Sequence, residues 1–193
     1  MANPTVANVV SAVPAVTGGV SHAVLGTALP TDTITALNVA FAGLGYVGDG
    51  GLTNSIARTT SPVRAWGGTQ VANLQTDYTE TFTFTFLETL NPEVVKAVFG
   101  SSNVTVTAAS STVGAKLAIK RNAATLAHEE VVFDMLDGVT KRRIVVPDGQ
   151  ISLNGDITYV DSATVSYPVT LTAFPDTSGN TSYEYTNDGK PTG

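Results

Sequence analysis

Hydrophobic and polar residues alternate most regularly along the segment 78–88. Aromatic residues fall at every second position, and threonines fill the positions between them. The two rows are Phe82, Phe84 and Phe86 on one side, and Thr81, Thr83 and Thr85 on the other. A period of two over this length is typical of a β-strand with one buried face and one polar face. The sequence therefore predicts a long, half-buried strand here.

Shorter apolar or alternating runs lie on both sides of this segment. We expect strands over 33–41, 104–108, 115–120, 130–136, 141–146, 157–160 and 165–174, with a short extended piece at 183–185. The pair Asp137-Gly138 separates two of these runs and indicates a hairpin turn. Strands at this spacing are typical of a β-sandwich or barrel.

One helix is expected, over about residues 91–99. Asn91 suits the N-cap, Pro92 suits the first helical position, and Glu93 lies near the positive end of the helix dipole. Gly100 follows as a C-terminal stop. The valines at 94, 95 and 98 and the phenylalanine at 99 supply an apolar side that should pack against a sheet.

The stretch after the first expected strand is rich in glycine. Residues 43–48 match the spacing of a dinucleotide-binding loop, but the following residues cannot open a good helix, and no acidic residue stands about 20 positions further on. We therefore interpret residues 45–62 as a long loop between strands, of the kind that usually carries function or contacts. Trp66, the only tryptophan, is expected to anchor the core.

Three parts of the chain differ in character. Residues 1–30 are apolar and nearly uncharged, and they form either a disordered tail or, as we favour, an arm that docks on a neighbouring subunit. Residues 31–175 form the β domain, and 176–193 form a polar C-terminal segment. The candidate subunit contacts in the arm and loop are Val9, Val10, Val13, Val16, Tyr46, Asp49, Leu52, Ile56 and Arg58.

Composition supports a mainly β protein. The chain has 193 residues, of which only 13% are charged, and it contains 29 Thr and 25 Val. These residue types favour strands over helices. A polar but uncharged exterior also suggests that other subunits cover part of the surface. No run of about 18 apolar residues occurs, and no positively charged leader precedes the apolar start, so we expect no membrane contact and synthesis without export.

Charge and motif content argue against enzymes and nucleic-acid-binding proteins. The net charge is −6, and cysteine is absent. The one basic cluster, Lys141-Arg142-Arg143, alternates across a strand, so it is either a protected sheet edge or a charge-paired subunit contact. No nucleophile elbow, phosphate-binding loop or paired metal-binding histidines occur in the sequence. We expect no cofactor, no metal and no catalytic residue.

The order of these features resembles the major tail, or tail tube, protein of long non-contractile-tailed bacteriophages, especially those of actinobacterial hosts. The resemblance covers about residues 34–185. It rests on Leu44-Gly45-Tyr46-Val47, Ser55-Ile56-Ala57-Arg58-Thr59-Thr60, Ala65-Trp66-Gly67-Gly68, Asn91-Pro92-Glu93-Val94-Val95-Lys96, Arg142-Arg143-Ile144-Val145-Val146-Pro147 and Val169-Thr170-Leu171-Thr172-Ala173-Phe174-Pro175-Asp176. No single motif is decisive, but the ordered set is specific.

The resemblance implies a β-sandwich or barrel with one flanking α-helix, whose copies form hexameric rings that stack into a tube. Its partners would be further copies of itself, the tape measure protein, the tail terminator and the tail tip. Duplex DNA would pass through without specific binding, along a face that Thr81, Thr83 and Thr85 could provide, with an acidic lining that repels it. The protein would be made in the host cytoplasm and reside in the virion tail.

Two rival classes remain beside this hypothesis. Another β-sandwich virion component, such as a tail tip, baseplate or capsid-decorating protein, could share the scaffold. A sugar-binding β-sandwich would place aromatic residues at loop tips, where Tyr46, Tyr183 and Tyr185 are the candidates.

Overall fold

The structure is a computed structural model that describes residues 9–15 and 18–190. It is mainly β, with one α-helix, and the predicted fold class is confirmed. The strands are β1 (Val13–Pro14), β2 (Val20–Val24), β3 (Ala42–Gly43), β4 (Thr53–Arg64), β5 (Gln70–Phe86), β6 (Val104–Thr107), β7 (Lys116–Ile119), β8 (Glu129–Asp137), β9 (Thr140–Leu153), β10 (Tyr167–Ala173) and β11 (Tyr183–Asn187). The helices are α1 (Pro92–Phe99) and the 3-10 turn η2 (Ser101–Asn103).

One antiparallel sheet of nine strands forms the body. Its main path runs β3-β2-β8-β9-β10-β5-β4, while β1 pairs with β8 and β11 pairs with β9. The predicted turn at Asp137-Gly138 joins β8 to β9, and Gly138 has the positive φ of 59° that such turns favour in glycine. The long strand β9 binds β11 through residues 141–145 and β10 through residues 149–153.

The sheet curls around an aromatic core. Phe82 and Phe84 of β5 both pack against Phe133 of β8, with ring centroids 5.4 and 5.5 Å apart. These strands are separated by β9 and β10 in the sheet, so only a strongly curved sheet brings their side chains together. The phenylalanine row predicted by the alternation is therefore the row that fills the core.

The segment 42–48 nearly closes this curl. Its first part pairs with β2, and Leu44 N–H donates to the Val20 carbonyl at 2.9 Å. Its second part reaches the end of β5, where Val47 bridges to Phe86 and Gly48 N–H donates to the Thr85 carbonyl at 2.8 Å. One short segment thus bonds to strands from both ends of the sheet path, which gives the body a barrel-like form.

Helix α1 covers the core as predicted. The Asn91 side chain accepts a hydrogen bond from Glu93 N–H at 3.0 Å, so it caps the first turn. The helix buries its apolar side, and Phe99 packs edge-on against Tyr167 with centroids 5.5 Å apart. Gly100 ends the helix with a φ of 88°.

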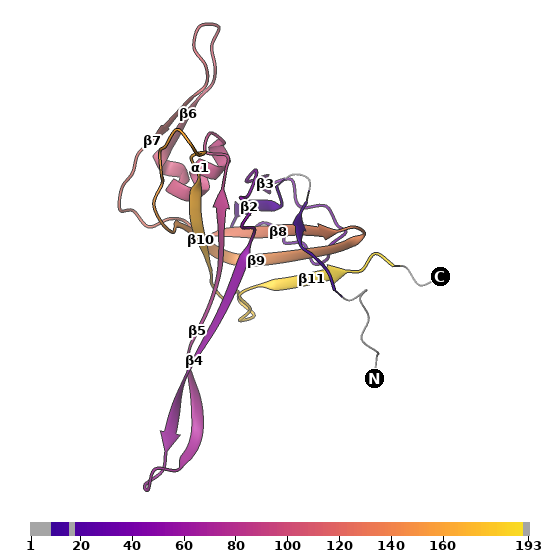
Figure 1. Ribbon diagram of the computed structural model, residues 1–193, viewed down its shortest axis with the longest axis vertical. Helices are drawn as coiled ribbons and strands as arrows, with labels where there is room; N and C mark the ends of the chain where they lie inside the picture. The colour runs from indigo at the N-terminus through magenta and orange to yellow at the C-terminus, as the bar shows by residue number, and fades with distance from the viewer. Residues whose placement is uncertain (1–8, 16–17, 191–193) are drawn as a thin grey trace.

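Two hairpins leave the body at opposite ends of the long axis (Figure 1). The longer is β4–β5, which is paired from Thr53↔Thr83 out to Arg64↔Gln70 and contains two register shifts. The shorter is β6–β7, which forms its own two-stranded sheet beside α1.

The predicted loop 45–62 is wrong beyond residue 52, because residues 53–64 are strand β4. Both faces of this strand are exposed, so no apolar row marks it in the sequence. Trp66 is also not a core anchor: it lies in the hairpin turn and is fully exposed, at 106%. The turn lies outside the body, so the side chain has no core to pack into.

Two predicted strands are absent. Over 33–41, Asp32 accepts hydrogen bonds from Ile34 N–H and Thr35 N–H, and these bonds hold the backbone in a turn. The segment 157–160 pairs with no strand, and β10, the next strand along the chain, already pairs with β5 on one side and β9 on the other.

Candidate assembly surfaces

The projecting half of the β4–β5 hairpin is the least buried part of the described chain. Every residue of β4 and the first eight residues of β5 are exposed. Its exposed apolar side chains are Ile56, Val63, Trp66, Val71 and Leu74. Apolar side chains gathered on an element without an intramolecular cover indicate a contact surface.

The candidates Ile56 and Arg58 lie on this hairpin, in β4 rather than in a loop. Ile56 is 57% exposed. The Arg58 guanidinium stacks over the Tyr78 ring at 4.6 Å and donates to Gln75 Oε1 at 3.0 Å. Arg58 therefore makes contacts within its own hairpin and stiffens it, while Ile56 presents apolar surface.

The hairpin tip is a well-defined turn. Gly68 N–H donates to the Ala65 carbonyl at 3.0 Å, and Arg64 Nη1 donates to the Gly68 carbonyl at 2.9 Å. Trp66 occupies the second turn position, and Gly67 occupies the third with a φ of 99°, as a type II turn requires. The tryptophan at the apex is thus held by its backbone alone.

The three candidate channel-facing threonines share a continuous polar face. They stand opposite residues of β10 and β4, which in turn continue the face onto β9. The face consists of Thr53, Ser55, Thr81, Thr83, Thr85, Gln150, Ser152, Pro168, Thr170 and Thr172. Directly opposite residues in an antiparallel pair point to the same side of the sheet. None of these ten residues is charged, and the acidic lining that the net charge suggested stays a prediction.

A small apolar cavity lies at the opposite end of β5 from the tip. Its volume is about 240 Å³, and the candidates Asp49 and Leu52 line it. Phe133 and Met135 of β8 form another wall. Tyr46 does not line this cavity: it is 64% exposed, and its N–H donates to Glu88 Oε1 at 3.0 Å.

The N-terminal candidates lie beside the sheet. Val9, Val10 and Val13 are exposed, and Val13 pairs with Leu136 in the β1–β8 ladder. Strand β2, also from the expected arm, is an internal strand of the subunit's own sheet, between β3 and β8. Residues 1–8 and Val16 lie outside the described residues, so a contact role there stays a prediction.

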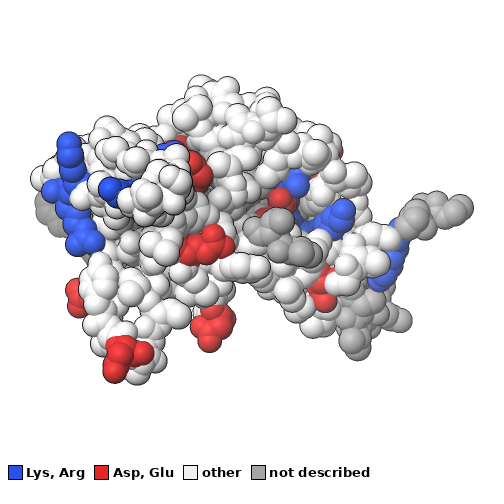
Figure 2. Space-filling view, turned by 90° about the horizontal axis from the view of Figure 1, so that it is seen from above, with Lys and Arg blue, Asp and Glu red and all other residues white. Residues whose placement is uncertain are grey.

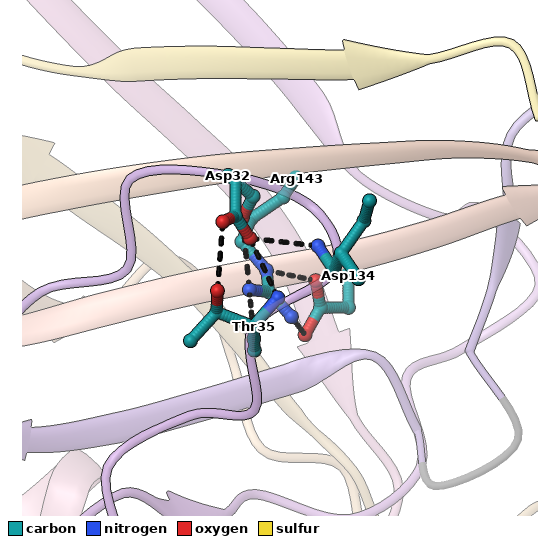
Figure 3. A network of polar contacts seen from close by, with 5 residues as sticks. Asp32, Thr35, Asp134 and Arg143 are labelled. Atoms are coloured by element: carbon teal, nitrogen blue, oxygen red, sulfur yellow. Dashed lines mark hydrogen bonds and ion pairs between the residues drawn. The ribbon is translucent and has the colours of Figure 1, made fainter.

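A buried arginine fastens the loop 31–41 onto the sheet (Figure 3). Arg143 is 7% exposed; its Nε donates to Asp134 at 2.6 Å, and its Nη1 donates to the carbonyls of Asp32 and Thr35 at 2.9 Å each. Hydrogen bonds from the backbone and hydroxyl of Thr35, then from Ile34 N–H, lower the pKa of Asp32. The sequence placed Arg143 at an exposed edge or subunit contact; the structure pairs it internally.

The loop held by Arg143 presents apolar residues outward. Ile34 is 70% exposed and Val39 is fully exposed. The neighbouring basic residue, Arg142, forms a half-exposed ion pair with Glu184 of β11 at 3.1 Å. Of the basic cluster, Arg142 and Arg143 thus have partners inside the subunit.

A second polar anchor was missed by the sequence analysis. Glu80 lies on the same face of β5 as the core phenylalanines and, although it is acidic, is only 2% exposed. It accepts hydrogen bonds from Asn54 Nδ2 at 3.0 Å, from Ser182 Oγ at 2.9 Å and from Thr181 Oγ1. The carboxylate therefore ties the C-terminal segment to the base of the hairpin, where the core ends. An acidic residue in the phase of the phenylalanine row was the available signal.

Charged side chains are scattered in the view along the long axis, with wide uncharged areas between them (Figure 2). Within residues 9–15 and 18–190, no group of three or more metal-ligating side chains comes together. In the same part of the chain, no helix has the length and apolar character needed to cross a membrane.

Comparison with known proteins gives one family. The family model described as phage tail tube protein matches residues 6–192, nearly the whole chain. No curated protein matches the chain.

Proposed function

Because this chain belongs to the phage tail tube protein family, with a structural role in the tail, we propose that its copies form hexameric rings that stack into a tube for DNA ejection. The family match over residues 6–192 is the observation that carries this proposal. Self-assembly and residence in the virion tail follow from the family itself. The tape measure protein, tail terminator and tail tip are the further partners we propose.

The β4–β5 hairpin supports contacts between rings. From Ala57 to Trp66 it extends roughly 30 Å, at about 3.3 Å per residue, and both its faces are exposed in the single subunit. Head-to-tail contacts that do not close generate filaments, whereas those that close generate rings. A long arm that reaches away from the body suits the non-closing contacts between rings. The loop 31–41, which Arg143 holds with Ile34 and Val39 outward, suits the closing contacts within a ring.

The hydroxyl-rich face of β9, β10, β5 and β4 is the proposed channel lining. Hydroxyl and amide groups offer DNA no fixed positive charge, so phosphates gain no counterion release by touching them. An uncharged lining lets DNA pass by failing to bind it, and repulsion from lining acids is not required. Thr81, Thr83 and Thr85 lie at the centre of this face.

Electron microscopy of the purified full chain at rising concentration tests the proposal. Negative-stain images should show rings and stacked tubes, and cross-sections of the tubes should show sixfold symmetry. A protein that sediments as a monomer at high concentration contradicts the tube proposal, and rings with another symmetry contradict the hexamer.

A further inference from the structure

Trp66 and the apolar cavity lie at opposite ends of one strand. Trp66 stands four residues before β5 begins at Gln70, whereas the cavity wall formed by Val47 and Gly48 pairs with Phe86 and Thr85 at the end of β5. A contact between these two features cannot form within one subunit. Between two subunits it runs head to tail along the long axis, which is the geometry of a non-closing, filament-forming contact.

The two features also match in chemistry. The tryptophan is fully exposed at the apex of a fixed turn, with an uncovered aromatic surface. Buried aromatic side chains and tryptophan in particular dominate interface energies when they fill a partner pocket. The cavity offers Leu52, Phe133 and Met135 as apolar and sulfur contacts.

The size and polarity of the cavity limit which group can occupy it. Its volume of about 240 Å³ is below the roughly 300–1,000 Å³ typical of small-molecule sites, and it suits one large side chain. Asp49 at the cavity supplies a carboxylate that can accept a hydrogen bond from an indole N–H. The exposed residues Ala12 and Gly51 in its lining show that it opens to solvent.

We propose that Trp66 of one subunit inserts into the cavity beside Leu52 and Met135 of the next subunit along the tube. This inference rests on the proposed tube function, which supplies the second copy. The tight turn and the Arg64 clamp fix the backbone that carries the indole before contact, so little backbone entropy is lost on docking.

Intrinsic fluorescence provides a direct test, because Trp66 is the only tryptophan. Assembly should shift its emission to shorter wavelength and protect it from acrylamide quenching. Tubes seen by electron microscopy whose tryptophan stays as quenchable as in the monomer overturn the insertion and leave the tube function standing. Absence of tubes under all conditions overturns both.

Cross-linking identifies the pocket. The chain has no cysteine, so Thr69→Cys at the tip and Ala12→Cys at the cavity can be made in separate proteins without background. After co-assembly, a short bis-maleimide should join the two variants into a dimer. The matched control pairs Thr69→Cys with Ser111→Cys in the β6–β7 turn and should give none. Tubes that yield only the control dimer, or neither dimer, contradict the assigned pocket.

A substitution series measures the contribution of the indole. Trp66→Ala should raise the protein concentration needed for tube formation by about tenfold or more, as expected of an interface anchor. Trp66→Tyr should recover part of that loss. Val113→Ala, an exposed apolar residue in the turn of the other hairpin, is the matched control and should assemble normally. An unchanged threshold for Trp66→Ala overturns the proposal.

Discussion

Arg143 does more at the residue scale than pair with one acid. Its guanidinium bonds to both oxygens of Asp134 and to two backbone carbonyls of the loop 31–41. A planar fork with several donors can serve all these acceptors at once, and an ammonium group cannot. The loop's outward apolar residues thus depend on one side chain of β9.

We predict that Arg143→Lys lowers the free energy of unfolding by about 2 kcal/mol, because buried acceptors lose their donors. Urea denaturation measures this change. The backbone amides of Ile34 and Thr35 should also exchange faster with deuterium. Arg142→Lys, in the half-exposed pair with Glu184, is the matched control and should cost less than about 1 kcal/mol. Equal effects of the two substitutions would show that Arg143 does not act through its buried fork.

Glu130 is a buried carboxyl whose charge is poorly compensated. It is 4% exposed; Oε1 accepts from Gly26 N–H at 2.9 Å, and Oε2 has no partner among the described residues. Burial raises the pKa of Glu130 above its ordinary 4.5, while hydrogen bonds from the Gly26 and Thr27 backbone oppose the shift. The folded protein therefore holds this proton more tightly than the unfolded chain does.

The sign of the resulting pH dependence follows from linkage. Stability tied to Glu130 is greatest below the ordinary pKa and is lost as pH rises through the raised folded pKa. We predict that Glu130→Gln removes this loss, so that its unfolding free energy relative to the wild type increases from pH 4 to pH 7. Denaturant titrations across this range measure the difference. The exposed control Asp156→Asn should lack this trend, and a flat difference for Glu130→Gln contradicts the prediction.

At the scale of elements, the β4–β5 hairpin separates folding from assembly. Its base is part of the body, where Glu80 and the phenylalanine row are buried. Its outer half is held mainly by the backbone ladder and by local contacts such as the one from Arg64 Nη1 to the Gly68 carbonyl. An element with little buried surface contributes little to global stability.

We predict that the outer half can be removed without unfolding the subunit. Thr59 and Asp77 are directly paired, so residues 60–76 can be replaced by a two-residue Asn-Gly turn. The free energy of unfolding should change by less than about 1 kcal/mol, while long tubes should be lost. Circular dichroism follows the fold and electron microscopy the tubes. Normal tubes from this variant would refute the proposed ring-to-ring role.

At the scale of the whole molecule, the charge distribution determines whether the protein binds DNA. The net charge is −6, and the proposed lining carries no charged residue among its strand-paired positions. Two arginines of the one basic cluster are paired within the subunit. The ten basic side chains are also outnumbered by 16 acidic ones, so the molecule as a whole repels phosphate groups.

We predict no measurable binding of duplex DNA to the purified protein. Low salt gives electrostatic association its best chance, so fluorescence titrations with labelled duplex should be run there. Micromolar binding that weakens with salt would contradict a passive conduit. A variant with Thr83→Lys on the proposed lining provides the contrast, because a lysine repeated around a channel should slow or retain DNA.

The sequence by itself determined the β class, the long half-buried strand and the capped helix. These features are local. The alternation of Phe82, Phe84 and Phe86 with threonine predicts a strand without knowledge of its partner strands. Asn91 and Pro92 likewise mark the start of the helix by their own capping and backbone preferences. The sequence also indicated which face of this strand would be polar. Successive side chains point to opposite faces, so the phenylalanines define the buried face and the threonines the polar one.

Only the tertiary structure decided the roles of residues whose partners are distant in sequence. Strand β4 has two exposed faces, so no pattern distinguished it from a loop until its pairing with β5 was seen. Arg143 and Glu80 are buried by segments about 110 and 100 residues away, the loop at 32–35 and the turn at 181–182. Trp66 is exposed because its turn leaves the body, which no property of the residue itself reveals. The burial or exposure of these side chains depends on long-range packing of the chain, and the phase of Glu80 with the phenylalanine row is the one local signal of it.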